Sequence, residues 1–153
     1  MDLSKFAVSV EINSNIETVW QALTDWETQG KWMLLTKVWS HPTPDIIGTK
    51  ISAFTGIAPK SFPVKKQSAF PRIGILDQME ITEWQPPTFC KVVHTGNVIK
   101  GIGTFELIKI SDQKIRFNWY EEIAAPAIVL ALIRPGILLS VRYSLWRFGR
   151  SVA

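Results

Sequence analysis

The sequence predicts an α+β fold that combines one antiparallel sheet of seven strands with two short helices and a long C-terminal helix. Two observations indicate this class. Apolar and polar residues alternate at residues 6–12 and over most of residues 34–122, as in half-buried strands. Residues 124–150 instead repeat apolar residues at the spacing of a helix. We expect a single domain over residues 1–153, which is an ordinary domain length.

The first strand is predicted near the N-terminus, where Phe6, Val8 and Val10 alternate with polar or small residues. The sequence SNIE follows it and has the pattern of a capping box, with Ser14 as N-cap and Glu17 three residues later. Apolar residues at helical spacing then predict a short helix. A second short helix or turn is predicted in DWETQGKWM, before the chain returns to the sheet.

The remaining strands are predicted between residues 34 and 122. LLTKVW and GTKISAFT come first, and an irregular, proline-rich segment follows at residues 56–72. The chain continues with RIGILDQMEITEW, FCKVVHT, VIKGIGTFELIKI and KIRFNWYEE. Short turns join these last four segments, which predicts an antiparallel meander. Gly101 and Gly103 are expected to permit a bulge or tight curvature in it.

The most apolar part of the chain is AAPAIVLALIRPGILLSVRYSLWRFGR, residues 124–150, and we predict an amphipathic helix there. A membrane span needs about 20 predominantly apolar residues, whereas Arg134 and Pro135 interrupt this segment. A kink or break is expected at Arg134, because proline cannot donate a backbone hydrogen bond and disfavours helical geometry before it. The stripe that should cover the sheet consists of Leu130, Ile133, Ile137, Val141, Leu145 and Phe148.

Composition and charge exclude several classes of protein. The lone cysteine, Cys90, allows no intrachain disulfide and forms no zinc motif, so no metal is expected. The N-terminus has no signal-peptide pattern, and we expect a cytoplasmic protein that is a monomer or a homodimer. The net charge of +4 is moderate, and aromatic and basic residues do not interleave on a strand, so nucleic-acid binding is not expected.

Common catalytic and cofactor motifs are not found in the sequence. GIGTFE has two glycines of a dinucleotide-binding motif, but Glu106 replaces the third, and the segment lies in a strand pattern. The chain contains no nucleophile elbow, phosphate-binding loop or HExxH motif. We therefore expect no cofactor.

The order of the elements and several short motifs resemble the START-like superfamily, and within it the SRPBCC proteins of the polyketide cyclase/dehydrase type. The motifs are ETVWQALTDWETQGKWM after the first strand, then MEITEWQPP, HTG, GTFE and FNWYEE. The similarity covers nearly the whole chain, and residues 56–72 depart from it. The resemblance implies a helix-grip fold, in which a curved sheet wraps around the C-terminal helix. It also implies a cavity between sheet and helix for a hydrophobic or amphipathic ligand.

The alternation indicates which side chains would line such a cavity. The apolar candidates are Met79, Ile81, Val92, Phe105, Phe117, Trp119, Ile137, Leu138 and Val141. These residues would equally suit a solid core. Polar residues on an apolar face are more informative, and the inward ones are Asp77, His94 and Glu121.

These polar residues predict a contact between a histidine and a carboxylate. If a tight Gly-Asn turn sets the register, His94 pairs with Ile99 and lies beside Met79, with Asp77 diagonal to it. Glu121 is then expected too far along the sheet to complete a cluster of three. A histidine with a carboxylate could act as a general base in aldol cyclisation or dehydration. The competing interpretation is a structural histidine that a neighbour satisfies.

Three functions are compatible with the sequence. The first, which we favour, is binding or transport of a hydrophobic small molecule such as a lipid, isoprenoid or polyketide. The second is a cyclase/dehydrase-type enzyme that uses His94 with Asp77. The third is a peripheral membrane module, in which Lys65, Lys66 and the C-terminal arginines contact anionic lipid weakly while the sequence SAF inserts.

Overall fold

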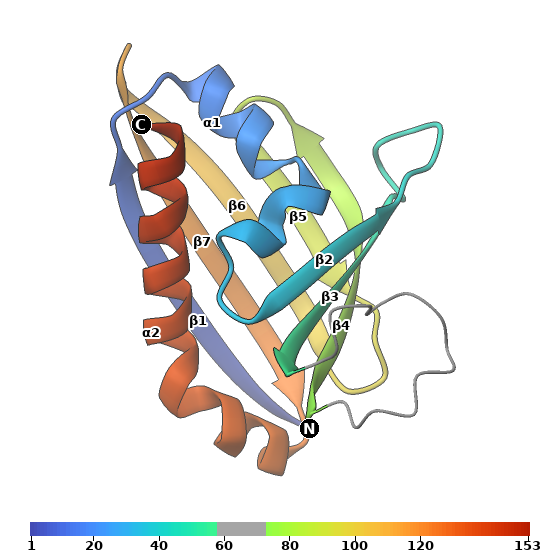
Figure 1. The fold of residues 1–153 in the computed structure, drawn as a ribbon. Helices are drawn as coiled ribbons and strands as arrows, with labels where there is room; N and C mark the ends of the chain where they lie inside the picture. The colour runs from blue at the N-terminus through green and yellow to red at the C-terminus, as the bar shows by residue number, and fades with distance from the viewer. Residues whose placement is uncertain (58–72) are drawn as a thin grey trace.

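The described part of the chain, residues 1–57 and 73–153 of a computed structural model, forms one sheet with helices on its concave side (Figure 1). The elements are β1 (Asp2–Ile12), α1 (Ile16–Leu23), the 3-10 helix η1 (Trp26–Lys31), β2 (Thr36–His41), β3 (Lys50–Ile57), β4 (Ile73–Gln85), β5 (Phe89–His94), β6 (Lys100–Ser111), β7 (Lys114–Ala125) and α2 (Ala127–Val152). The predicted class and order of elements are confirmed. Most of the irregular segment predicted at residues 56–72, with Lys65 and Lys66, lies outside the described residues.

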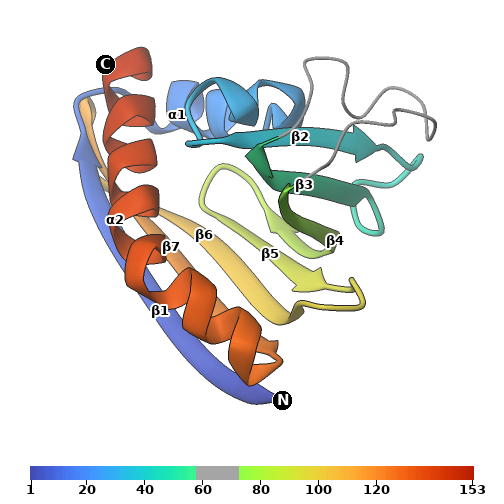
Figure 2. The same ribbon diagram turned by 60° about the horizontal axis from the view of Figure 1, so that its bottom comes forward.

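The seven strands follow the order β1-β7-β6-β5-β4-β3-β2, and every neighbouring pair is antiparallel. The sheet is strongly curved, and α1, η1 and α2 lie on its concave side (Figure 2). Strand β7 shows the alternation that predicted it, because its inward residues from Ile115 to Ala125 are all buried. The buried inward faces of β1 and β7 form the centre of the hydrophobic core.

Helix α1 begins one residue later than the capping box predicted. Asn15, not Ser14, is the N-cap, and its side-chain oxygen accepts a hydrogen bond from the Thr18 backbone N–H at 2.8 Å. The Ser14 residue is buried. The helix packs Val19 and Leu23 into the core, as its apolar spacing predicted.

A continuous series of aromatic rings fills one end of the concave face. Neighbouring rings have centroids 4.8–6.5 Å apart, which suits tilted, stacked and edge-to-face contacts. The series links α1 and η1 with the sheet and α2, in the order Trp20, Trp84, Trp26, Phe105, Phe117, Phe148 and Trp32. Four of the seven tryptophans, together with three phenylalanines, therefore build this end of the core.

The sequence predicted a kink or a break at Arg134. The structure has no break there, because helix α2 continues through Pro135. Its N-terminal part runs at an angle to its C-terminal part in both views, which agrees with the other outcome, a kink (Figures 1 and 2). A helix of 26 residues contains enough further hydrogen bonds to tolerate the one that proline removes. Within the predicted stripe, Leu130, Leu145 and Phe148 are buried, and the other three residues are half-buried.

The C-terminal half of α2 is fixed to the rest of the protein by polar contacts. The Ser144 hydroxyl accepts a hydrogen bond from the Leu34 backbone N–H at 3.0 Å and donates one to the Ser140 carbonyl at 2.8 Å. The Arg147 guanidinium donates to the Lys31 carbonyl at 2.9 Å. The helix lies mainly along the edge strand β1.

We expect the two faces of α2 to differ sharply in their effect on stability. Phe148→Ala should lower the free energy of unfolding by about 3–5 kcal/mol, because it removes a fully buried ring from the aromatic series. Leu139→Ala, on the exposed face of the same helix, should change it by less than about 0.5 kcal/mol. Urea denaturation followed by circular dichroism measures both values. Equal losses would contradict the assignment of the two faces.

Candidate functional site

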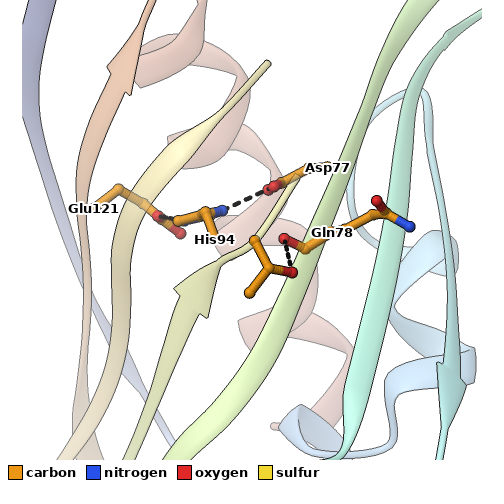
Figure 3. Close-up of polar contacts among 5 residues, drawn as sticks. Asp77, Gln78, His94 and Glu121 are labelled. Atoms are coloured by element: carbon orange, nitrogen blue, oxygen red, sulfur yellow. Dashed lines mark hydrogen bonds and ion pairs between the residues drawn. The ribbon is translucent and has the colours of Figure 1, made fainter. Parts of the chain in front are cut away.

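A buried ion cluster lies on the concave face of the sheet, with His94 between two carboxylates (Figure 3). The His94 Nδ1 atom lies 2.8 Å from Asp77 Oδ1, and its Nε2 atom lies 2.6 Å from Glu121 Oε2. The His94 residue is only 3% exposed, and Glu121 is also buried. Both ring nitrogens therefore have a carboxylate partner and are shielded from water.

The structure brings Glu121 into the cluster, which corrects our expectation that it lies too far from His94. The β5–β6 connection spans residues 95–99 and is longer than the tight turn assumed from the sequence. His94 consequently pairs with Gly101 instead of Ile99, and Gly101 pairs with Ile123 of β7. This shift of two residues places Glu121 diagonally across β6 from His94. The predicted neighbours of His94, Met79 beside it and Asp77 diagonal to it, are found as expected.

Gly103 provides the space through which Glu121 reaches His94. It pairs with Glu121 on β7, and a Cβ atom at this position would lie 2.7 Å and 2.8 Å from the two carboxylate oxygens. A bulge or tight curvature was expected at Gly101 and Gly103. The pairing of β6 with both neighbours is regular at these glycines, so they form no bulge. Sequence reasoning missed this role, although a glycine on the inward face opposite an inward glutamate was the available signal.

The two carboxylates reverse the effect that burial has on the histidine. Burial alone would lower the pKa of His94, but the hydrogen bonds and charges of Asp77 and Glu121 outweigh it and raise this pKa to about 10. Burial is also the main cause that raises the pKa of Glu121, and the imidazolium opposes that rise. At neutral pH the cluster therefore contains a cationic His94 that compensates buried negative charge.

This arrangement limits the chemistry that the site can perform. With a pKa of about 10, only about one His94 side chain in 10³ is neutral at pH 7 and able to accept a proton. Burial raises the pKa of the Cys90 thiol to about 12, so this cysteine is not an activated nucleophile. Among the described residues, no group of three or more His, Cys, Asp or Glu side chains has the arrangement of a metal site.

The predicted lining residues divide into two sets. Those that are fully or almost fully buried within the core cluster are Ile81, Val92, Phe117 and Trp119. Those that pack against the core and remain partly exposed are Met79, Phe105, Ile137 and Val141. Leu138 differs from both sets, because it is exposed. The less covered lining residues therefore lie on β4, on β6 and in the middle of α2.

Two surface depressions lie elsewhere on the described part of the protein. A volume of about 560 Å³ is open to solvent beside β4, β5 and β6, where it is lined by outward residues such as Glu83, Glu106 and Ile108. A smaller one of about 210 Å³ lies between η1 and α2, beside Trp32 and Arg147. Neither depression includes the ion cluster.

Solved structures with the same architecture place this site in a known fold. A START superfamily protein from Mycobacterium smegmatis has a TM-score of 0.71 at 9% identity, and the match covers 97% of this chain and 99% of that one. The Zhui aromatase/cyclase from Streptomyces sp. R1128 has a TM-score of 0.67 at 10% identity, with 99% and 97% covered. A conserved protein from Geobacillus kaustophilus has a TM-score of 0.70 at 16% identity, with 97% and 95% covered.

The chain therefore has the START-type helix-grip fold, as its motifs and element order implied. At these identities the likeness establishes the fold alone. No family model matches the sequence, and no curated protein matches it.

We predict that the contribution of His94 to stability falls as the pH rises. Its pKa is about 10 in the folded protein against 6.5 for an ordinary histidine. The added stability is therefore complete below pH 6.5, declines between pH 6.5 and 10, and is lost above about pH 10. Near pH 6, His94→Gln should lower the free energy of unfolding by about 3–5 kcal/mol, because two buried carboxylates lose their cation. Urea denaturation measures the difference in free energy of unfolding between the wild type and His94→Gln, which should become smaller from pH 6 to pH 10. A difference that stays constant would contradict the ion cluster.

A double-mutant cycle tests the contact between Gly103 and Glu121. Gly103→Ala should lower the free energy of unfolding by about 1–3 kcal/mol, because the new methyl group displaces the carboxylate. In a Glu121→Ala background the same change should have little effect, since the crowded atoms are gone. Gly96→Ala is the matched control, because its Cβ would have only ordinary contacts from 3.6 Å outward. Equal effects in both backgrounds would show that Gly103 has another role.

Proposed function

We propose that the protein binds a hydrophobic or amphipathic small molecule on the concave face, between β4 and the middle of α2. The observation that carries this proposal is the row of partly exposed apolar side chains on the inward face, including Met79, Ile137 and Val141. Inward apolar residues of a solid core are normally covered completely. Of these residues, Met79 pairs with His94 of the buried ion cluster, so apolar surface and a polar group lie side by side there.

Asp77 is the member of the ion cluster that a ligand can reach. Its side chain is 20% exposed, whereas those of His94 and Glu121 are 2% and 10% exposed. A carboxylate held by an imidazolium accepts hydrogen bonds but donates none. We therefore infer a ligand with an apolar body and a hydroxyl or ammonium donor that binds Asp77.

The ion cluster favours binding over catalysis by His94. A general base needs a neutral ring nitrogen within reach of the substrate, but both nitrogens of His94 contact carboxylates and the ring is buried. The cyclase/dehydrase-type alternative with His94 and Asp77 would require the ligand to displace one of these partners. A cytoplasmic location and the oligomeric state remain predictions from the sequence.

The binding site is tested by filling it with a larger side chain. Ile137→Trp should weaken binding of a fluorescent fatty alcohol by at least about tenfold, because the indole would cover the partly exposed apolar side chains of the proposed site. Leu139→Trp is the matched control, since this residue lies on the exposed face of the same helix. Fluorescence titration of both variants and the wild type measures the affinities, and circular dichroism verifies that each is folded.

Equal affinities for the three proteins, or no binding by the wild type, would contradict the proposal. Mass spectrometry of molecules extracted from the purified protein then distinguishes a carrier from an enzyme. A ligand that the wild type alters chemically and His94→Gln leaves unaltered would support the enzyme instead.

A further inference from the structure

The outward face of α2 carries a second apolar stripe, which the inward stripe predicted from the sequence does not include. We name it the outer stripe, and its members are Ile128, Leu132, Leu139, Tyr143 and Trp146. Leu132 is 77% exposed and Leu139 is 70% exposed. Ile128 and Leu132 lie on the N-terminal part of the helix, and Leu139, Tyr143 and Trp146 lie on its C-terminal part.

The outer stripe runs along a single line of the helix. Its residues follow one another at steps of four, seven, four and three, which are spacings that return to the same helical face. The opposite face contains Leu130, Leu145 and Phe148, which are buried in the core. One side of α2 therefore belongs to the fold, while the other carries the exposed apolar residues of the outer stripe.

Positive charge accompanies the outer stripe, and helical spacing places Arg142, Arg147 and Arg150 beside it. Helix α2 contains Arg134, Arg142, Arg147 and Arg150 and no acidic residue, and all four arginines are exposed. None of them forms an ion pair with a carboxylate of the described residues. The surface thus combines apolar side chains with unneutralised cations.

Two arginines and two aromatic rings form a stacked group at the C-terminal end of the outer stripe. The Tyr143 and Trp146 rings are stacked with centroids 5.9 Å apart. The Arg150 guanidinium lies 5.1 Å from the Trp146 centroid, and that of Arg147 lies 5.9 Å from the Tyr143 centroid. Tryptophan, tyrosine and arginine are the side chains that suit the boundary between lipid headgroups and acyl chains.

We propose that the outer stripe docks on the surface of an anionic membrane, with α2 parallel to the bilayer plane. Apolar side chains would enter the headgroup boundary, and the arginines would contact lipid phosphates and carboxylates. Charge complementarity favours this partner over a second copy of the chain, because two copies would bring their arginines together with no carboxylate on the helix to neutralise them.

The buried face of α2 favours docking over crossing. Although α2 is long and apolar enough to cross a membrane by length and composition, a crossing would remove Leu145 and Phe148 from the core. The polar contacts of Ser144 and Arg147 with the η1–β2 region would also be lost. The inferred contact does not depend on the proposed ligand site. It shares the C-terminal arginines with the contact predicted from the sequence, but the outer stripe takes the place of Lys65, Lys66 and the sequence SAF.

Vesicle sedimentation with the full-length protein tests the docking surface. The wild type should bind vesicles of phosphatidylcholine and phosphatidylserine more tightly than vesicles of phosphatidylcholine alone. This preference should disappear in about 1 M salt, where the Debye length is about 3 Å. Leu132→Ser with Leu139→Ser should reduce binding by at least about tenfold, because two inserted side chains are lost. The double variant Arg142→Gln with Arg150→Gln should reduce the affinity for the anionic vesicles by about fivefold for each charge removed, and leave the affinity for the neutral vesicles unchanged.

The matched control is Ile108→Ser with Ile110→Ser, which removes two exposed apolar side chains from β6 and should leave binding unchanged. The proposal is wrong if the wild type does not bind the anionic vesicles or if the outer-stripe variant binds as well as the control. Light scattering that shows a dimer dissociated by the outer-stripe variant would assign the surface to a second copy and overturn the membrane contact. If the wild type can be released from membranes only with detergent, and not with high salt, α2 would span the membrane and the docking proposal would be overturned.

Discussion

The ion cluster of Asp77, His94 and Glu121 constrains the four strands β4 to β7. A buried imidazolium is costly unless anions compensate it, and a buried carboxylate is costly unless a cation does. The cluster meets both requirements only if β4 holds Asp77 beside His94 of the neighbouring strand β5, and β7 holds Glu121 within reach of His94 across β6. Gly103 satisfies the remaining condition, because a larger residue on β6 would occupy the position of the Glu121 carboxylate.

The same constraint divides the concave face into two regions with different properties. Aromatic rings fill the end under α1 and η1, where α2 is held by the buried Leu145 and Phe148. Met79, which pairs with His94 of the ion cluster, and Ile137 of α2 are only partly covered. The aromatic end anchors α2, and under the proposed function the less covered end accommodates the ligand.

The sequence predicted the elements well and the distances between them poorly. Alternation in β7 and apolar spacing in α1 identify a face without any knowledge of the neighbours. Strand register depends on loop length. We assumed a tight turn between β5 and β6, whereas the connection spans residues 95–99, so the expected position of Glu121 relative to His94 was wrong by two residues. The N-cap was misplaced for a similar local reason, since both Ser14 and Asn15 have suitable side chains and only Asn15 accepts the hydrogen bond.

The apolar spacing of α2 explains why its outer stripe was missed and why it matters. A helix that is apolar on two opposite faces satisfies the pattern of an amphipathic helix on whichever face is examined first, and the stripe from Leu130 to Phe148 accounted for the fold. Only the structure shows that Leu130, Leu145 and Phe148 of this stripe are buried while Leu132 and Leu139 remain exposed. A ligand that is poorly soluble in water has to pass between the protein and a lipid phase. The same helix borders both the proposed ligand site and the proposed membrane contact, so docking through α2 would bring the site to the source of such a ligand.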